Sequence, residues 1–182
     1  ELLGDYGDYL LSLAYAHCIE PKNLNNMEEW YRRTDLHNIL NLKEVSEKKL
    51  YQALDSTNDK DFELVQKKIF NKVQEVYKIK PKGYFFDVTN VYFYGTECSI
   101  AKKGHNKEGT YNPQIQIGLA VTKEEGIPIL HKTFEGNIFD ARILKEFLVE
   151  FQNYNIQEIT LVWDRGCTSE DNLITARKVG FE

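Results

Sequence analysis

The chain has 182 residues, of which 42% are hydrophobic, and it carries a formal net charge of −5. This hydrophobic content suffices for a globular core. The negative net charge argues against a protein whose whole surface is basic enough to bind nucleic acid, so any DNA contacts would need local basic patches. Its three cysteines, Cys18, Cys98 and Cys167, lie far apart without a C-x-x-C spacing, which argues against a disulfide framework or a zinc site and favours a reducing cytoplasm.

Residues 1–80 are predicted to form an N-terminal helical region, because apolar residues recur there at helical spacing. The segment DSTNDKD, residues 55–61, predicts a turn with capping residues between two helices. The apolar stretch 9–19 is too short to span a bilayer and is flanked by acids, so we expect no membrane segment or signal peptide. One apolar stripe is expected to be packing surface and consists of Phe62, Val65, Ile69, Val73 and Val76.

From Pro81 onward the periodicity changes to that of strands, and residues 81–182 are predicted to form a second region. Three segments rich in aromatic and β-branched residues, or alternating polar with apolar residues, are expected to be consecutive antiparallel strands. These segments are residues 83–95, 114–122 and 127–136.

A helix, a strand and a second helix are expected to follow. Residues 140–151 place their apolar side chains on one helical face, with Asp140 as the expected N-cap. Residues 156–164 read as a strand, and residues 168–180 as a helix with Ser or Thr at its cap and Gly180 at its end. The order is βββαβα, and the crossover helix allows the fourth strand to lie parallel to the first. The sequence therefore predicts a mixed α/β fold with a mixed sheet.

Two acids stand on the first and fourth of these strands. Asp87 interrupts an apolar strand, and Asp164 ends another just before a turn that contains glycine. If the two strands are neighbours, both carboxylates face one point, and such hard oxygen ligands suit Mg²⁺ or Mn²⁺. A metal centre of this kind points to phosphoryl chemistry. A turn-forming role remains the alternative for Asp164.

Around these acids the sequence resembles the DDE transposases of bacterial insertion sequences, in the type-four group. Four blocks within residues 83–175 carry the resemblance: DVTNVYFYG, KKGHNKEGTYNPQIQIGLAVTKEEGIPI, FEGNIFDARIL and LVWDRGCTSEDNL. The resemblance implies a ribonuclease H-like core, in which Asp87 and Asp164 are two members of a catalytic triad that binds Mg²⁺ or Mn²⁺.

The same resemblance implies metal-dependent phosphodiester hydrolysis and strand transfer, with transposon ends and target DNA as partners and a homodimer as the intact assembly. The third acid of the triad, a Glu in a later helix, has no counterpart here, because Glu170, Asp171 and Glu182 come too early. We therefore expect a fragment that is inactive alone, from a bacterial, cytoplasmic, nucleoid-associated protein without membrane partners.

Basic residues crowd one segment of the second region. Lys102, Lys103, His105 and Lys107 lie in an expected loop with two glycines, which suits phosphate contacts in a DNA enzyme. A solvated hairpin loop would have the same composition, so both interpretations stay open.

Three further residues are candidates near the two acids. Arg165 could clamp a phosphate or pair with Asp164, and Asn137 lies in an expected turn close enough to the sheet edge to touch substrate. Thr89 shares a strand face with Asp87 and could orient it by a hydrogen bond, or it could only reflect β-propensity.

Two other classes of protein remain open. A phosphatase of the haloacid dehalogenase type is suggested by FFDVTN, which puts a possible Asp nucleophile at a strand end. That family places a second acid two residues on, where this chain has Thr89, and its first strand opens a parallel βαβ sheet. The other alternative is a non-catalytic relic or DNA-binding remnant of a transposase.

Overall fold

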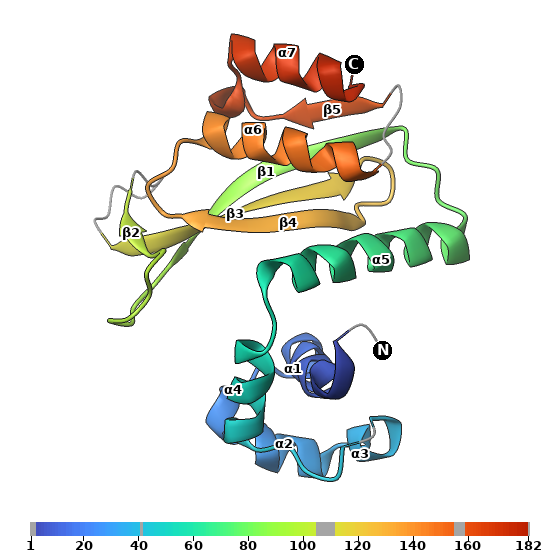
Figure 1. The fold of residues 1–182 in the computed structure, drawn as a ribbon, viewed down its shortest axis with the longest axis vertical. Helices are drawn as coiled ribbons and strands as arrows, with labels where there is room; N and C mark the ends of the chain where they lie inside the picture. Colours follow the sequence, from blue (N-terminus) through green and yellow to red (C-terminus); the bar gives the residue numbers. More distant parts are fainter. Residues whose placement is uncertain (1–2, 41, 105–111, 155–158, 182) are drawn as a thin grey trace. The chain divides into compact units, whose positions relative to one another are not determined.

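The computed structural model describes residues 3–40, 42–104, 112–154 and 159–181 (Figure 1). It divides into two compact units, Glu1–Val65 and Gln66–Glu182. This division lies inside a helix, whereas the domain boundary expected after residue 80 stays a prediction. In the described part of the chain, no helix combines the length and the apolar character needed to cross a membrane.

The first unit is helical. Its core is built from buried aromatic and aliphatic side chains, among them Trp30, Tyr31 and Leu50. The expected turn is confirmed, since one helix ends at Asp55, the next begins at Asp59, and the Asn58 side chain accepts a hydrogen bond from a following backbone N–H. The helical segments are η1 (Gly4–Tyr6), α1 (Gly7–Ile19), η2 (Leu24–Asn26), α2 (Met27–Arg33), α3 (Leu36–Ile39), α4 (Glu47–Asp55) and α5 (Asp59–Tyr77), the last of which continues into the second unit.

The packing stripe expected on α5 is wrong. Ile69 and Val76 are 58% and 57% exposed, whereas Phe70 is 3% exposed and belongs to the core of the second unit. One turn earlier, the Gln66 side chain accepts a hydrogen bond from the His131 backbone N–H at 2.7 Å. Consecutive helical residues are turned by about 100°, so the face of α5 that packs is set by Phe70 and Gln66 and not by the longer apolar stripe.

The second unit is built on a mixed five-stranded sheet. The antiparallel β1–β3 and β3–β4 pairs and the parallel β1–β5 pair confirm the predicted meander and the parallel fourth strand. A short strand that was not predicted, β2, pairs with β3. The strands are β1 (Gly83–Tyr92), β2 (Lys102–Lys103), β3 (Pro113–Thr122), β4 (Pro128–Glu135) and β5 (Thr160–Trp163).

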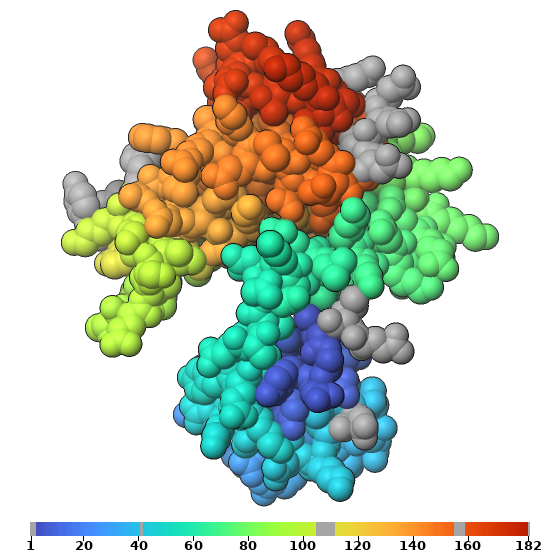
Figure 2. Space-filling model, in the orientation of Figure 1, coloured from blue at the N-terminus to red at the C-terminus, as the bar shows by residue number. Residues whose placement is uncertain are grey.

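Two helices, α6 (Asp140–Phe151) and α7 (Glu170–Val179), pack beside each other against the sheet (Figures 1 and 2). Large α6 side chains, including Phe147 and Phe151, are fully buried there. The short turns η3 (Gln152–Tyr154) and η4 (Arg165–Cys167) follow α6 and β5. The order βββαβα is thus confirmed, apart from the added β2, and the fold is a mixed α/β structure with a mixed sheet.

The ends of these helices agree only in part with the sequence. Ser169 is the N-cap of α7 and accepts from the Asn172 N–H at 3.1 Å, and Gly180 ends the helix with φ 103°, both as predicted. The predicted N-cap of α6 is wrong, because Phe139 occupies the N-cap position and Asp140 is the first helical residue. The Asp140 carboxylate instead accepts a hydrogen bond through Oδ1 from Gln116 Nε2 at 3.3 Å.

Candidate metal centre

The two predicted acids come from neighbouring strands. In the parallel β1–β5 pair, Phe86 lies opposite Trp163, and Asp87 and Asp164 are the next residues along each chain. Both acids are exposed. The register therefore places Asp87, in the middle of β1, beside Asp164, at the end of β5, while their role as metal ligands stays a prediction.

Local backbone groups orient both carboxylates. Asp87 Oδ1 accepts a hydrogen bond from the Val88 N–H at 2.9 Å, and Asp164 Oδ1 accepts from the Arg165 N–H at 2.6 Å. Asp164 is at the same time the N-cap of η4, so the turn-forming interpretation is also correct. Because both residues are exposed, a cation could reach their carboxylates from solvent.

The turn after Asp164 is held by side chains that the sequence did not single out. Trp163 Nε1 donates to Thr168 Oγ1 at 3.1 Å, across the turn. Asn172, only 1% exposed, donates through Nδ2 to the carbonyls of Cys167 at 2.8 Å and of Ala141 at 2.7 Å. Asn172 thus ties η4 to the beginning of α6. Its position in the first turn of the expected helix was the only signal in the sequence.

A third acid, Asp140, lies beside Asp164. A Cβ atom placed on Gly166 would be 3.7 Å from Asp140 Oδ2 and 4.0 Å from Asp164 Oδ2, so both carboxylates border one point. The pKa of the Cys167 thiol is raised to about 12, first by burial and then by the negative charges of Asp140, Asp164 and Asp87. All three acids therefore act on the same buried thiol, and the sequence had assigned Asp140 only to a helix cap.

The donor atoms suit Mg²⁺ or Mn²⁺, because both ions prefer hard oxygen ligands and Mg²⁺ keeps several waters when one or two carboxylates bind it. Across the described ranges, however, no group of three or more His, Cys, Asp or Glu residues is close enough to hold one metal ion together. Asp87 and Asp164 therefore fit a cation that retains part of its water shell.

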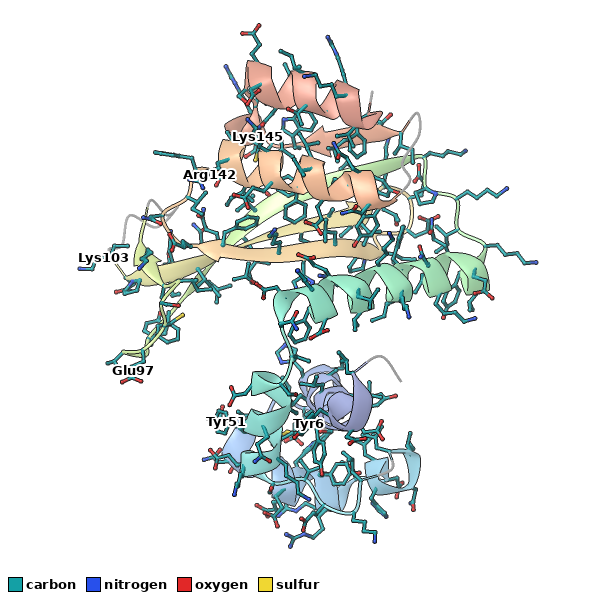
Figure 3. The ribbon with its side chains drawn as sticks, viewed as in Figure 1. Tyr6, Tyr51, Glu97, Lys103, Arg142 and Lys145 are labelled. Atoms are coloured by element: carbon teal, nitrogen blue, oxygen red, sulfur yellow. The ribbon has the colours of Figure 1, made fainter. Side chains whose placement is uncertain are left out.

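Lys102 and Lys103 form strand β2, which corrects the expected loop at these two positions. The backbone there is tightly packed: a Cβ on Gly136 would lie 2.7 Å from the Lys102 carbonyl oxygen, and a Cβ on Gly104 would lie 1.9 Å from the Gly136 carbonyl oxygen. Only glycines fit such an approach, which fixes β2 beside the turn that follows β4. Lys103 is exposed on β2 (Figure 3). His105 and Lys107 lie outside the described residues.

The remaining candidates lie at the surface. Arg165 is exposed and, in the ranges that the structure describes, forms no ion pair with Asp164, since only its backbone N–H contacts that carboxylate. Asn137 is exposed in the turn between β4 and α6. Thr89 makes no hydrogen bond to Asp87 in the described structure, so the expected orienting contact is absent and the Val88 N–H fills that role.

The sequence matches no known family model and no curated protein. Among solved structures, the fold is similar to a Mos1 transposase paired-end complex with left transposon end, at a TM-score of 0.39 and 10% identity over 98% of this chain and 58% of the other. A Mos1 strand transfer complex gives 0.39 and 10% over 98% and 57%, and a mariner Mos1 paired-end complex with Mg gives 0.36 and 12% over 98% and 58%. The chain spans less than two thirds of these proteins, and the similarity is too low to assign it to their family.

Proposed function

We propose that this chain carries part of the metal-binding centre of a DDE-type transposase, which hydrolyses a phosphodiester at a transposon end and transfers the freed strand into target DNA. The observation that supports the proposal best is the parallel pairing of β1 and β5, because its register places Asp87 beside Asp164. The four sequence blocks that resemble the bacterial DDE transposases contain both acids in the same order.

A bound Mg²⁺ or Mn²⁺ would polarise phosphate oxygens and lower the pKa of a coordinated water. Asp87 and Asp164 would each offer an oxygen to the ion, from side chains that neighbouring N–H groups already hold in place. Arg165, exposed beside the second acid, and Lys103 on β2 would contact DNA phosphates. Because these cations are few and the net charge is −5, we expect weak DNA binding by this chain alone.

The haloacid dehalogenase alternative is not supported. Its first strand belongs to a parallel sheet, whereas β1 pairs antiparallel with β3 along nine residue pairs, from Tyr84 to Tyr92. The position two residues after the first acid also holds Thr89 and not a second carboxylate. Both observations favour the transposase interpretation of Asp87.

The test is a titration with Mn²⁺ alone, followed by electron paramagnetic resonance of the free ion. We expect the unmodified chain to bind Mn²⁺ weakly. Asp87→Asn and Asp164→Asn should each lower the Mn²⁺ affinity at least about tenfold, as removal of other residues at metal sites does. Neither change should unfold the protein, because losing one charge relieves repulsion between neighbouring acids. Asp35→Asn is the matched control, since Asp35 lies in the helical unit and its side chain caps no helix.

The outcome separates the proposal from the relic alternative. A relic that retains only the fold would show the same Mn²⁺ titration in both variants as in the unmodified chain. A labelled DNA duplex, titrated by fluorescence anisotropy with and without Mg²⁺, extends the test to the partner. Binding that is unaffected by Mg²⁺ and by Asp87→Asn would favour a DNA-binding remnant.

A further inference from the structure

The segment that joins α5 to β1 carries three lysines that the proposed metal centre does not use (Figure 1). Lys78, Lys80 and Lys82 are exposed, whereas Ile79 and Pro81 between them are half-buried. Side chains that alternate in this way point to opposite sides of an extended chain. The three lysines therefore stand on the outward side of one segment.

Backbone hydrogen bonds hold the end of this segment against the sheet. The Lys82 carbonyl accepts from the Thr160 N–H of β5 at 3.3 Å, and the Gly83 carbonyl accepts from the Lys123 N–H at 2.9 Å. Pro81 fixes its own φ and disfavours a helical conformation for the residue before it. Because the backbone is held, less conformational freedom is lost when a partner binds the lysines.

Lys78 has a backbone conformation that stability does not favour. It follows the last residue of α5 with φ 54°, and in the part of the chain that the structure describes it is the one residue other than glycine with a positive φ. Glycine or asparagine is preferred at such a helix end, because a β-carbon is strained there. A lysine kept in this conformation points to a function of its side chain. The structural alternative is a favourable interaction of the cation with the dipole at the C-terminus of α5.

The charge of the chain is unevenly distributed along the sequence. Residues 1–65 hold seven Lys and Arg against thirteen Asp and Glu, whereas residues 66–182 hold sixteen against fifteen. The negative net charge therefore belongs to the helical unit. Glu75, in the last turn of α5, pairs with Lys72 at 3.0 Å, and among the described residues none of the three lysines of the segment forms an ion pair. Their charges are available to an anionic partner.

We propose that Lys78, Lys80 and Lys82 form a second DNA-contact surface, which binds phosphates of the duplex backbone without reading its sequence. The choice of DNA as the partner rests on the function proposed above, but the contact needs no metal ion. The segment from Lys78 to Lys82 spans at most about 14 Å, over which one DNA strand presents about four phosphates. Three lysines suit a backbone of this charge density.

The paired part of β1 and β5 lies between the lysines and the acids. The lysines precede its first pair, which includes Gly83, whereas Asp87 and Asp164 follow its last pair. At a rise of about 3.3 Å per residue, Lys82 and Asp87 lie about 17 Å apart along the chain, which corresponds to about five base pairs of a duplex. One short duplex is thus long enough to reach from the acids to the lysines.

The test is a fluorescence anisotropy titration of a labelled duplex of about 30 base pairs with the full chain, in EDTA and at several KCl concentrations. Changing all three lysines to Gln should weaken binding at low salt at least about tenfold. The slope of log affinity against log salt should become shallower by about 3, because each lost phosphate contact lowers it by about 0.9. A duplex of scrambled sequence should give the same result.

The matched control changes Lys43, Lys48 and Lys60 to Gln together. These lysines are exposed in the helical unit, and the change removes the same total charge, so affinity and salt slope should stay close to those of the unmodified chain. An equal loss in the control would overturn the inference, because a general charge effect would then explain the result. An unchanged salt slope in the variant of the α5–β1 segment would also overturn it, as would absence of DNA binding by the unmodified chain at the lowest salt.

Lys78→Gly separates a functional from a structural role of this residue. We expect weaker DNA binding together with an equal or higher melting temperature in circular dichroism, because glycine relieves the strain at the helix end. A lower melting temperature with unchanged DNA affinity would assign Lys78 to the helix dipole and overturn its place in the surface. Since EDTA removes divalent ions, failure of the Mn²⁺ titration would end the proposed metal centre without affecting this result.

Discussion

The two faces of the sheet differ in what covers them. On the face that packs against α6, Tyr84 and Phe86 are 2% and 3% exposed, whereas Phe85 and Val162 on the opposite face are 42% and 39% exposed. Both faces of β1 carry large apolar side chains, so hydrophobicity alone does not identify the covered side. The comparison teaches that the position of α6, and not the strand sequence, decides which residues form the core.

Strand β3 reverses the usual pattern in which apolar side chains face the core and polar side chains face solvent. Gln114, Gln116 and Thr122 are buried on its covered face, whereas Leu119 on the other face is 37% exposed. The bulk on the covered side comes from the helix: a Cβ atom on Gly118 would lie 2.6 Å from the Phe147 ring. The small residues on the covered face of β3 therefore leave room for the large side chains of α6. The buried glutamines form hydrogen bonds beyond the strand: Gln114 donates to the Gly136 carbonyl in the turn after β4, and Gln116 donates to Asp140 at the start of α6.

The largest expected effect tests the asymmetry of the two faces directly. Phe147→Ala should lower the free energy of unfolding by about 3–5 kcal/mol, because it empties a fully buried site. Phe85→Ala on the opposite face should cost about 1 kcal/mol or less, since that side chain is already half in water. Urea denaturation followed by circular dichroism measures both. Equal losses would mean that the open face is covered in solution.

A smaller effect is expected when one carbon is added to the covered face of β3, and almost none when it is added to the opposite face. Gly118→Ala should destabilise the protein by about 1–3 kcal/mol, because the new methyl group collides with Phe147 in a packed core. Val121→Ile, the control, adds one carbon to a partly exposed residue on the other face and should change stability by less than about 0.5 kcal/mol. A neutral Gly118→Ala would show that α6 shifts easily on the sheet.

The smallest effect appears only in alkaline solution. Burial raises the pKa of Tyr84 from 10.0 to about 12, so this tyrosine contributes stability that is fully present below pH 10 and is lost as the pH rises towards 12. Tyr84→Phe keeps the ring that stacks on Phe151 but has no proton to lose. Its free energy of unfolding should fall less steeply with pH, by up to about 1.4 kcal/mol per pH unit. Urea titrations between pH 9 and 11 test this, and parallel curves for the two proteins would contradict it.

Much of the fold was predictable because its signals are local. The helix at 140–151 was predicted from the spacing of its apolar residues and is found with the same bounds. The cap at Ser169 and the end at Gly180 follow from side-chain and backbone chemistry within one turn. The crossover helix between β4 and β5 predicted the parallel pairing that brings Asp87 and Asp164 together.

The candidate centre was predictable only where a residue stands directly on a strand that the sequence identifies. Asp140 was missed because an acid at a helix start has a sufficient local explanation, and its contacts to Gln116 and to the surroundings of Gly166 join segments far apart in the chain. The same limit applies to Lys102 and Lys103, since a two-residue strand gains its identity only from pairing with β3.

The sequence by itself determined the order of helices and strands, the turns between them and the two acids Asp87 and Asp164 on neighbouring strands, because each depends on periodicity or on neighbours in the chain. Only the tertiary structure decided which sheet face is covered, that Phe70 and not the apolar stripe of α5 is buried, and that Asp140 lies beside Asp164. These outcomes depend on where α5, α6 and η4 pack, and packing is fixed by the shapes of side chains from distant segments rather than by the pattern of any one of them.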